Sequence, residues 1–327
     1  MTDRARSLYG QRPMPNLARP FVIFVGVVAS SIGCRSSQND RQSGPAGGSE
    51  DSGPQATVAQ ADAEARGRAD ASQPVDPLAI PSASVEAVVN PGHMPAYTGP
   101  TGSVEGTVRV VGPDAPEVPG LVFRSCPAAI DMYAKAFRSG VPREDGSRAL
   151  ADALVVVTGY SGYVEEREPA VRVTVDRTCS YPSRTIAMTF GQRLEVTNDT
   201  KLPFGPYLVD TYTPVVRVAP PQNAGDPVRI YPPRADYFRM KDRLQPFIHE
   251  DVYVLRQPLH AVTDVTGHFR IAGVPVGHVT VSARLPMIGT DSARDVDVRA
   301  GAATDVELTL TYKPPAPPPA SSLPQIR

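Results

Sequence analysis

The stretch Gln257–Ala283 constrains the fold more than any other part of the sequence, because turn chemistry and strand periodicity agree along it. Asp264 and Gly267 predict a tight turn, since an aspartate can cap its own backbone and glycine accepts a positive φ. Apolar residues then alternate through two further segments, at Phe269, Ile271, Val279, Val281 and Ala283 and again at Val306, Leu308 and Leu310. This pattern predicts antiparallel β-sheet in which one face of each strand is buried.

Residues Ala261–Gly277 match the pattern A-V-T-D-x-x-G-x-F-x-I-x-x-V-P-x-G at every named position. The stretch resembles carboxypeptidase-regulatory-like domains, which are transthyretin-like β-sandwiches with a carbohydrate-binding-like fold. The resemblance implies such a sandwich over residues 257–312. It implies no peptidase activity, because the module is an accessory domain in that family and the sequence has no zinc-peptidase motif.

The N-terminus has the pattern of an export signal over residues 1–34. Arginines precede an apolar run, Phe21–Ala29, which is too short to span a bilayer as a helix and is followed by small residues up to Cys34. This ending resembles a bacterial lipobox, although Ser31 stands where leucine is usual. The resemblance implies a signal peptide, lipidation of Cys34 and an outer-membrane lipoprotein facing the periplasm or the cell surface. Plain secretion and a retained membrane anchor are the alternatives.

Composition divides the chain into tails and a folded part. The 327 residues include 36 prolines and 26 glycines, and six of the prolines fall within residues 313–327. Residues 35–100 contain few large apolar side chains, so we expect a disordered linker, and residues 313–327 form a Pro-rich tail that we also expect to be disordered. The net charge of −1 argues against a nucleic-acid partner, which would require a basic surface.

We expect the first strand at Ser103–Val111 and a second, buried strand at Ala153–Thr158. Between them, Pro127–Ser139 could form a short helix. The pattern G-x-V-x-G-x-V that starts at Gly102 is typical of the first strand of a regulatory-like domain. We therefore predict one sandwich built from about 101–160 and 257–312, with the region 165–256 inserted into it. Two consecutive sandwiches, divided near residue 256, are the competing layout.

Several residues in the middle of the chain match the motifs of a second known family. Asn198 opens one motif, and Pro246, Val252, Val254 and Pro258 fall in register with another. From residue 178 to residue 264 the sequence resembles the cupredoxin-like module of methylamine-utilisation-type secreted proteins. The resemblance implies an all-β chain in which a cupredoxin-like Greek-key β-sandwich, within residues 101–256, is combined with the regulatory-like sandwich.

The copper ligands of that module are not retained. A type 1 copper site requires a thiolate and two imidazoles, usually with a weak thioether. By the resemblance, the five ligand positions are occupied by Phe204, Tyr207, Asp242, Gln245 and Ile248. We therefore expect a degenerate copper site with no bound metal, and no other cofactor is indicated.

Two cysteines remain if Cys34 carries a lipid. Cys126 and Cys179 are an even pair in an exported protein, where the compartment is oxidising, so a disulfide is expected. A thiolate ligand or a nucleophile is the alternative, but neither cysteine has a histidine nearby in the sequence.

The polar run His249-Glu250-Asp251 could supply metal ligands together with Asp242. Neighbouring residues of a strand point to opposite faces, so we expect solvated polar residues instead. We have the same expectation for His260, His268 and His278.

No catalytic motif stands out, so the sequence favours a protein that is not an enzyme. We expect a binding or structural module of the bacterial cell envelope. Its expected partners are the membrane, through the lipid anchor, and an envelope protein or a glycan. One alternative is a periplasmic electron-transfer or metal-binding protein. The other is a carbohydrate-binding module that uses Tyr207 or Tyr237.

Overall fold

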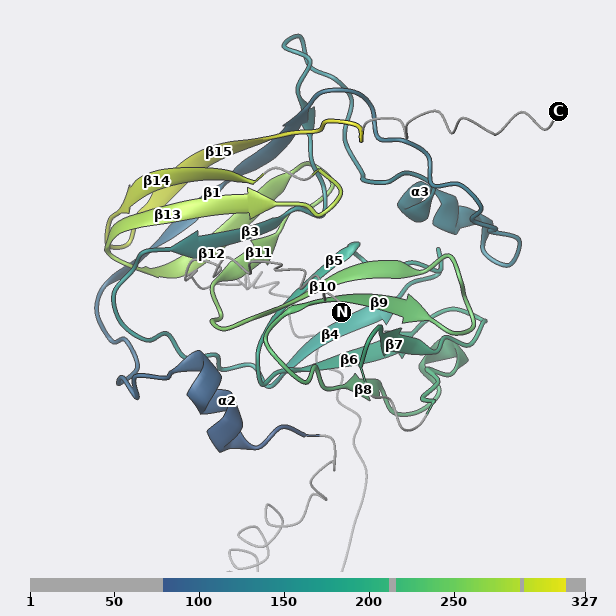
Figure 1. Cartoon of the computed structure of the whole chain (residues 1–327), viewed down its shortest axis with the longest axis horizontal. Helices are drawn as coiled ribbons and strands as arrows, with labels where there is room; N and C mark the ends of the chain where they lie inside the picture. The colour runs from purple at the N-terminus through teal and green to yellow at the C-terminus, as the bar shows by residue number, and fades with distance from the viewer. Residues whose placement is uncertain (1–78, 212–215, 289–290, 316–327) are drawn as a thin grey trace, which may run out of the picture. The chain divides into compact units, whose positions relative to one another are not determined.

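The computed structural model describes residues 79–211, 216–288 and 291–315. Strands dominate this part of the chain, and the helical segments in it are short: α2 (Ser82–Val89), η1 (Pro127–Ala129), α3 (Ile130–Tyr133) and η2 (Pro221–Asn223). Figure 1 shows the strands gathered in two separate bodies, one containing β1, β3 and β11 to β15 and the other containing β4 to β10. The expectation of an all-β fold is confirmed.

The first body, which we call the split sandwich, takes its strands from both ends of the described chain. One of its sheets has the order β12-β1-β15, with β2 also paired to β1, and the other has the order β11-β3-β13-β14. The strands are β1 (Thr101–Val111), β2 (Arg148–Ala149), β3 (Leu154–Thr158), β11 (His260–Val262), β12 (His268–Pro275), β13 (Gly277–Arg284), β14 (Ser292–Val298) and β15 (Ala303–Thr311).

Strand β1 lies between two strands from the far end of the chain. It pairs antiparallel with β12, where Val104 faces Ile271, and parallel with β15, where Val108 faces Leu308. It also pairs antiparallel with β2, at Arg109 and Val110. The pairings of β1 within the described residues thus follow the inserted layout and not two consecutive sandwiches.

The second body, which we call the inserted sandwich, is formed by the residues between β3 and β11. Its sheets have the orders β5-β10-β9-β7 and β4-β6-β8. The strands are β4 (Ala170–Val175), β5 (Thr185–Thr189), β6 (Arg193–Asn198), β7 (Pro206–Leu208), β8 (Val228–Ile230), β9 (Tyr237–Asp242) and β10 (His249–Leu255). Two pairs, β4 with β6 and β5 with β10, are parallel.

The predicted turn at Asp264 is confirmed. The Oδ1 atom of Asp264 accepts hydrogen bonds from the backbone N–H groups of Thr266 and His268, at 2.8 and 3.0 Å. Gly267 has a φ of +75°, and a Cβ atom there would lie 2.5 Å from the carbonyl oxygen of Val108. Only glycine combines this backbone conformation with so close an approach of β1.

Each sandwich has its own hydrophobic core, and a smaller apolar cluster joins them. Leu154 and Val156 of β3 pack with Tyr253 of β10 in this third cluster. The carboxylate of Asp152 reinforces the contact, because Oδ1 accepts the N–H of Arg184 at 3.0 Å and the side chain forms an ion pair with Arg138. The two sandwiches are therefore joined by apolar contacts and by a hydrogen bond from the backbone of Arg184 to Asp152.

The folded chain begins earlier than the sequence predicts. The expected linker of residues 35–100 is wrong for its described part, because α2 places Ile80, Val85, Val88 and Val89 against the core of the inserted sandwich. An isolated helix of this length would be marginal, but tertiary packing of one apolar side stabilises it. The helix expected over Pro127–Ser139 is also shorter, ending at Tyr133, since Lys135 forms a β-bridge with Glu117.

Cys126 and Cys179 form the predicted disulfide, with their Cα atoms 6.0 Å apart. Both half-cystines are buried in the core of the inserted sandwich, so the bond ties the loop before η1 to that core. The predicted signal peptide and Cys34 lie outside the described residues, as do residues 316–327 of the predicted tail. None of the described helices is long and apolar enough to cross a membrane.

Candidate functional site

The positions expected to hold copper ligands are mostly part of the core of the inserted sandwich. Phe204 and Ile248 are 0% and 1% exposed and pack in this core. The backbone N–H and C=O groups of Phe204 are bonded to Ala219 in a two-residue bridge, which holds the aromatic ring in the interior. Apolar side chains therefore occupy space that a metal centre would need.

Asp242, at the expected thiolate position, supports the backbone. Its Oδ1 atom accepts hydrogen bonds from the N–H groups of Leu244 and Gln245, at 2.8 and 2.9 Å, where β9 ends in a turn. Burial raises the pKa of this carboxyl group, and the hydrogen bonds from backbone N–H groups partly offset that shift. Such a group caps a turn and is not available as a soft ligand.

The remaining two positions are also engaged with protein groups. The Gln245 side chain donates to the carbonyl oxygen of Pro203 and accepts from Ser125, both at 3.3 Å. The ring of Tyr207 lies beneath the guanidinium group of Arg243, at 4.4 Å from its centroid. A set of Phe, Tyr, Asp, Gln and Ile side chains offers neither thiolate nor imidazole, so the residues present do not fit a type 1 copper ion.

The run His249-Glu250-Asp251 is not the solvated surface that the sequence predicts. Glu250 is 1% exposed, Asp242 is 5% exposed, and His249 and Asp251 are half-buried. No group of three or more His, Cys, Asp or Glu residues in the described part of the chain could hold a metal ion. Burial here follows from the loop of residues 116–136, which covers this end of β10 and which strand periodicity does not reveal.

A hydrogen-bonded network surrounds the start of β10. The hydroxyl of Tyr133 donates to Oε1 of Glu250 at 2.5 Å, and Oε2 of Glu250 is buried without a partner among the described residues. Burial raises the pKa of Glu250 well above its ordinary value, because the charged form loses its hydration. The same burial raises the pKa of Tyr133, which remains a donor.

Arg184 lies beside this network and is itself only 8% exposed. Its Nη1 donates to the carbonyl oxygens of Lys135 and Ala136, at 2.7 and 3.2 Å, and its Nη2 donates to His249 at 2.8 Å. The guanidinium group is therefore held in one position by groups that carry no negative charge.

Basic side chains share one face of the β9–β10 pair. Lys241 lies opposite His249 and Arg239 lies opposite Asp251, and residues directly opposite in an antiparallel pair point to the same side of the sheet. Asp251 accepts a hydrogen bond from the hydroxyl of Tyr237 at 2.6 Å. Burial raises the pKa of Asp251, and the hydrogen bond from Tyr237 and the charges of Arg184 and Arg239 partly offset that shift.

This face opens into a cavity of about 320 Å³, which we call the basic pocket. Its polar lining comprises Arg184, Arg239, Lys241, His249, Glu250 and Asp251. Its apolar lining comprises Val118, Leu121, Ala136, Pro246, Ile248 and Met287. A concave site with apolar walls and a few convergent charged groups has the general character of a small-molecule site.

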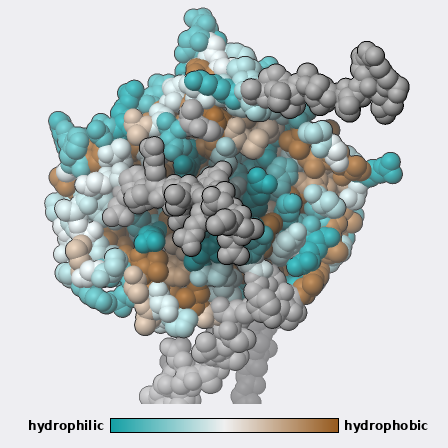
Figure 2. Space-filling model, viewed as in Figure 1, coloured by the Kyte–Doolittle hydropathy of each residue, from teal (hydrophilic) through white to brown (hydrophobic). Residues whose placement is uncertain are grey.

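Apolar groups are also exposed near the basic pocket. Met287, which lines the basic pocket, is 49% exposed, and Val122 is 61% exposed. A second hollow of about 440 Å³, lined by Arg124 and Phe247 among others, shares Leu121 and Pro246 with the basic pocket. Figure 2 shows that exposed apolar residues occur in several places among hydrophilic ones on the face in view.

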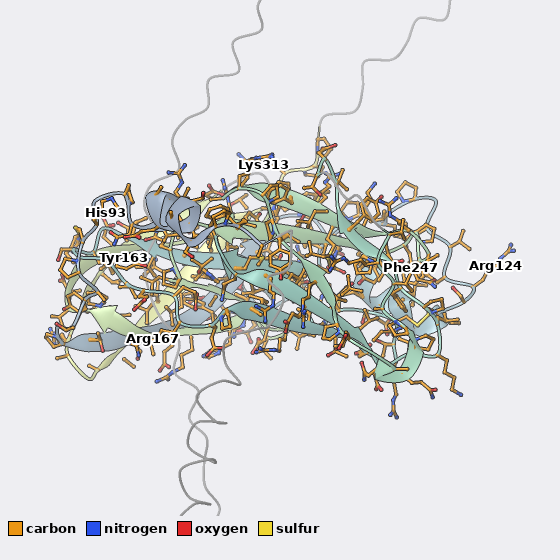
Figure 3. The ribbon with its side chains drawn as sticks, turned by 90° about the horizontal axis from the view of Figure 1, so that it is seen from below. His93, Arg124, Tyr163, Arg167, Phe247 and Lys313 are labelled. Carbon is orange, nitrogen blue, oxygen red and sulfur yellow. A yellow bond between two sulfur atoms is a disulfide. The ribbon has the colours of Figure 1, made fainter. Side chains whose placement is uncertain are left out.

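A larger hollow of about 580 Å³ lies between α2 and the segment 163–169. Its lining includes Tyr163, Arg167 and several glutamates: Glu86, Glu165, Glu166 and Glu168. Figure 3 shows Tyr163 and Arg167 well separated from Phe247 and Arg124. This hollow is thus distinct from the basic pocket and has the opposite charge.

The tyrosines and the other histidines singled out from the sequence lie outside the lining of the basic pocket. Tyr207 and Tyr237, the candidates for a glycan site, lie on β7 and β9, and the ring of Tyr237 packs against Tyr253 with a centroid distance of 5.2 Å. The expectation of a solvated His260 is wrong, since its Nε2 atom is buried, whereas His268 and His278 are exposed.

Sequence reasoning missed the basic pocket. The alternation of Tyr237, Arg239 and Lys241 could have indicated a polar outer face of β9. Nothing in the sequence signals that Arg184 and the loop of residues 116–136 lie against that face.

No protein-family model matches the chain, and no curated protein matches it. Among solved structures, two reduced variants of amicyanin share 14% and 15% sequence identity with it, each with a TM-score of 0.23. Each alignment covers 28% of this chain and 86% of the amicyanin. The Cu-containing nitrite reductase NirK from Thermus scotoductus SA-01 shares 17% identity at a TM-score of 0.22, covering 30% of this chain and 24% of the reductase. TM-scores of this size assign neither a family nor a function to the chain.

Proposed function

We propose that this protein is a non-catalytic binding protein of the bacterial cell envelope, exported and anchored by a lipid on Cys34, with a copper-less cupredoxin-like domain. One observation supports the absence of copper from this domain. The expected copper ligands are replaced by Phe204 and Ile248, which fill the core, and by Asp242, which caps a turn. A site converted to packing and backbone support has no remaining role in electron transfer.

Export and anchoring are supported by sequence alone. The apolar run Phe21–Ala29 ends shortly before Cys34, as in bacterial lipoprotein signals. The Cys126–Cys179 disulfide agrees with a protein that matures in an oxidising compartment. The proposed partners are the membrane, through the lipid, and an envelope protein or a glycan.

A copper-binding assay tests the proposal against its nearest rival, a periplasmic electron carrier or metal-binding protein. The purified chain is incubated with Cu(II), desalted and analysed by elemental analysis and visible absorption. We expect less than about 0.1 equivalent of copper and no thiolate-to-copper band, because none of the five positions supplies a soft ligand. One bound equivalent of copper would overturn the proposal.

The second rival, a carbohydrate-binding module, makes a different prediction. Sugar binding by stacking needs exposed aromatic faces, but Tyr207 lies beneath Arg243 and Tyr237 packs against Tyr253. Binding on a glycan array that is lost in Tyr207→Ala or Tyr237→Ala would promote this rival.

A further inference from the structure

The basic pocket contains more positive than negative charge. Arg184, Arg239 and Lys241 contribute three cations, whereas Asp251 is the only carboxylate of the lining that is not fully buried. No ion pair within the described residues involves any of these three cations. An anion in the pocket would be attracted by all three.

Two lining groups are prepared to donate hydrogen bonds to an anion. The Arg184 guanidinium is fixed by two backbone carbonyls and His249, so little side-chain entropy remains to be lost on binding. Glu250 lines the same pocket, and its Oε2 atom is buried without a partner among the described residues. When protonated, this carboxyl group can donate to an oxygen of a ligand.

The apolar part of the lining restricts the ligand further. Val118, Leu121 and Met287 line the pocket together with the basic groups, and Met287 is 49% exposed. Apolar walls favour a ligand that carries an apolar body. They disfavour a small, multiply charged anion such as phosphate, because transferring two charges out of water costs more than transferring one.

We propose that the basic pocket binds an amphipathic organic acid, with its carboxylate at Arg184, Arg239 and Lys241 and its apolar chain against Leu121 and Met287. The volume of about 320 Å³ lies at the lower end of the range typical of small-molecule sites. The inference rests on the proposed function, since it names the ligand class of a binding protein that does not use copper.

Isothermal titration of the full chain with decanoate, below its micellar concentration, tests the proposal. We expect one site with a Kd on the order of micromolar, weaker binding of acetate and no binding of decyltrimethylammonium. Lys241→Glu should weaken decanoate binding about tenfold or more, because it reverses one of the three charges. The exposed Lys201, which does not line the pocket, provides the matched control: Lys201→Glu should change the Kd by less than about twofold.

Four results would overturn the proposal: absence of decanoate binding, equal binding of decyltrimethylammonium, binding of inorganic phosphate as tight as that of decanoate, or an unchanged Kd in Lys241→Glu. Circular dichroism and urea unfolding check that both lysine variants fold, and Lys241→Gln provides a milder substitution if Lys241→Glu does not. Copper analysis of the same samples separates the two claims. Bound copper would refute the proposed function. Protein that contains no copper and does not bind decanoate would refute only this inference.

Discussion

The Nη2 atom of Arg184 lies 2.8 Å from Nε2 of His249, while Nδ1 of the same imidazole lies 2.8 Å from the carbonyl oxygen of Phe247. A carbonyl oxygen can only accept, so Nδ1 carries the proton and Nε2 accepts from the guanidinium group. The pKa of His249 is lowered, first by burial and then by Arg184. The imidazole is therefore neutral near pH 7 and serves to position Arg184.

Replacing Arg184 with lysine should destabilise the protein by about 3 kcal/mol. Lysine cannot reproduce a planar group that reaches two carbonyl oxygens and an imidazole at once. Urea unfolding measures the change. The exposed Arg256 is the control, and Arg256→Lys should leave the free energy of unfolding within about 0.5 kcal/mol of the wild-type value. Equal values for the two variants would show that the Arg184 contacts contribute no net stability.

The Glu250→Gln variant should become increasingly stable relative to the wild type as the pH rises. Because the folded-state pKa of Glu250 is raised above its unfolded value, its contribution to stability is fully present below that unfolded value, about 4.3, and is lost as the pH rises through the folded-state pKa. Glutamine can still accept the hydrogen bond from Tyr133 but does not titrate. The free energy of unfolding of the variant, measured from pH 4 upwards, should therefore increase relative to that of the wild type. A pH-independent difference between the two proteins would contradict a buried, protonated Glu250.

His260→Leu should remove part of the loss of stability in acid. Burial lowers the pKa of His260 to about 4 from 6.5, so its stabilising contribution is present above pH 6.5 and is lost as the pH falls towards 4. The full contribution is roughly 3 kcal/mol by linkage. The melting temperature should therefore fall less between pH 6.5 and pH 4 for His260→Leu than for the wild type. His268→Leu, at an exposed histidine of β12, is the control and should retain the wild-type pH dependence.

Reduction of the Cys126–Cys179 disulfide should lower the free energy of unfolding by about 4 kcal/mol, because the bond spans 53 residues of sequence. Urea unfolding with and without a reductant gives this value. The single variants Cys126→Ala and Cys179→Ala should lose nearly as much as the double variant, since either one opens the same loop. Additive losses would mean that the cysteines contribute separately.

Cys34→Ser should release the protein from the membrane into the soluble periplasmic fraction. The predicted anchor is the lipid on this cysteine, and metabolic labelling with palmitate should depend on it. Fractionation and labelling of both proteins give the result. Label that persists in the variant, or wild-type protein recovered in soluble form, would show that the protein is not anchored by a lipid on Cys34.

Strands, turns and the cysteine pair were determined by the sequence alone. Alternation along Phe269 and Ile271, and the Asp264–Gly267 turn, depend on interactions within a few residues, so a local pattern is sufficient to predict them. That Phe204 and Ile248 offer no thiolate, thioether or imidazole ligand is likewise a matter of residue type.

Pairing and burial were decided by the tertiary structure. Periodicity identifies β1 as a strand, but its pairing with β12 and β15 joins segments more than 150 residues apart in the sequence, with the inserted sandwich between them, and only the tertiary structure selects that arrangement. Alternation likewise places Glu250 on one face of β10 without showing that Tyr133 covers it. The basic pocket forms because Arg184, β9 and the loop containing Leu121 meet in space. Charge and burial at such a site depend on neighbours that are distant in sequence, which a local pattern cannot specify.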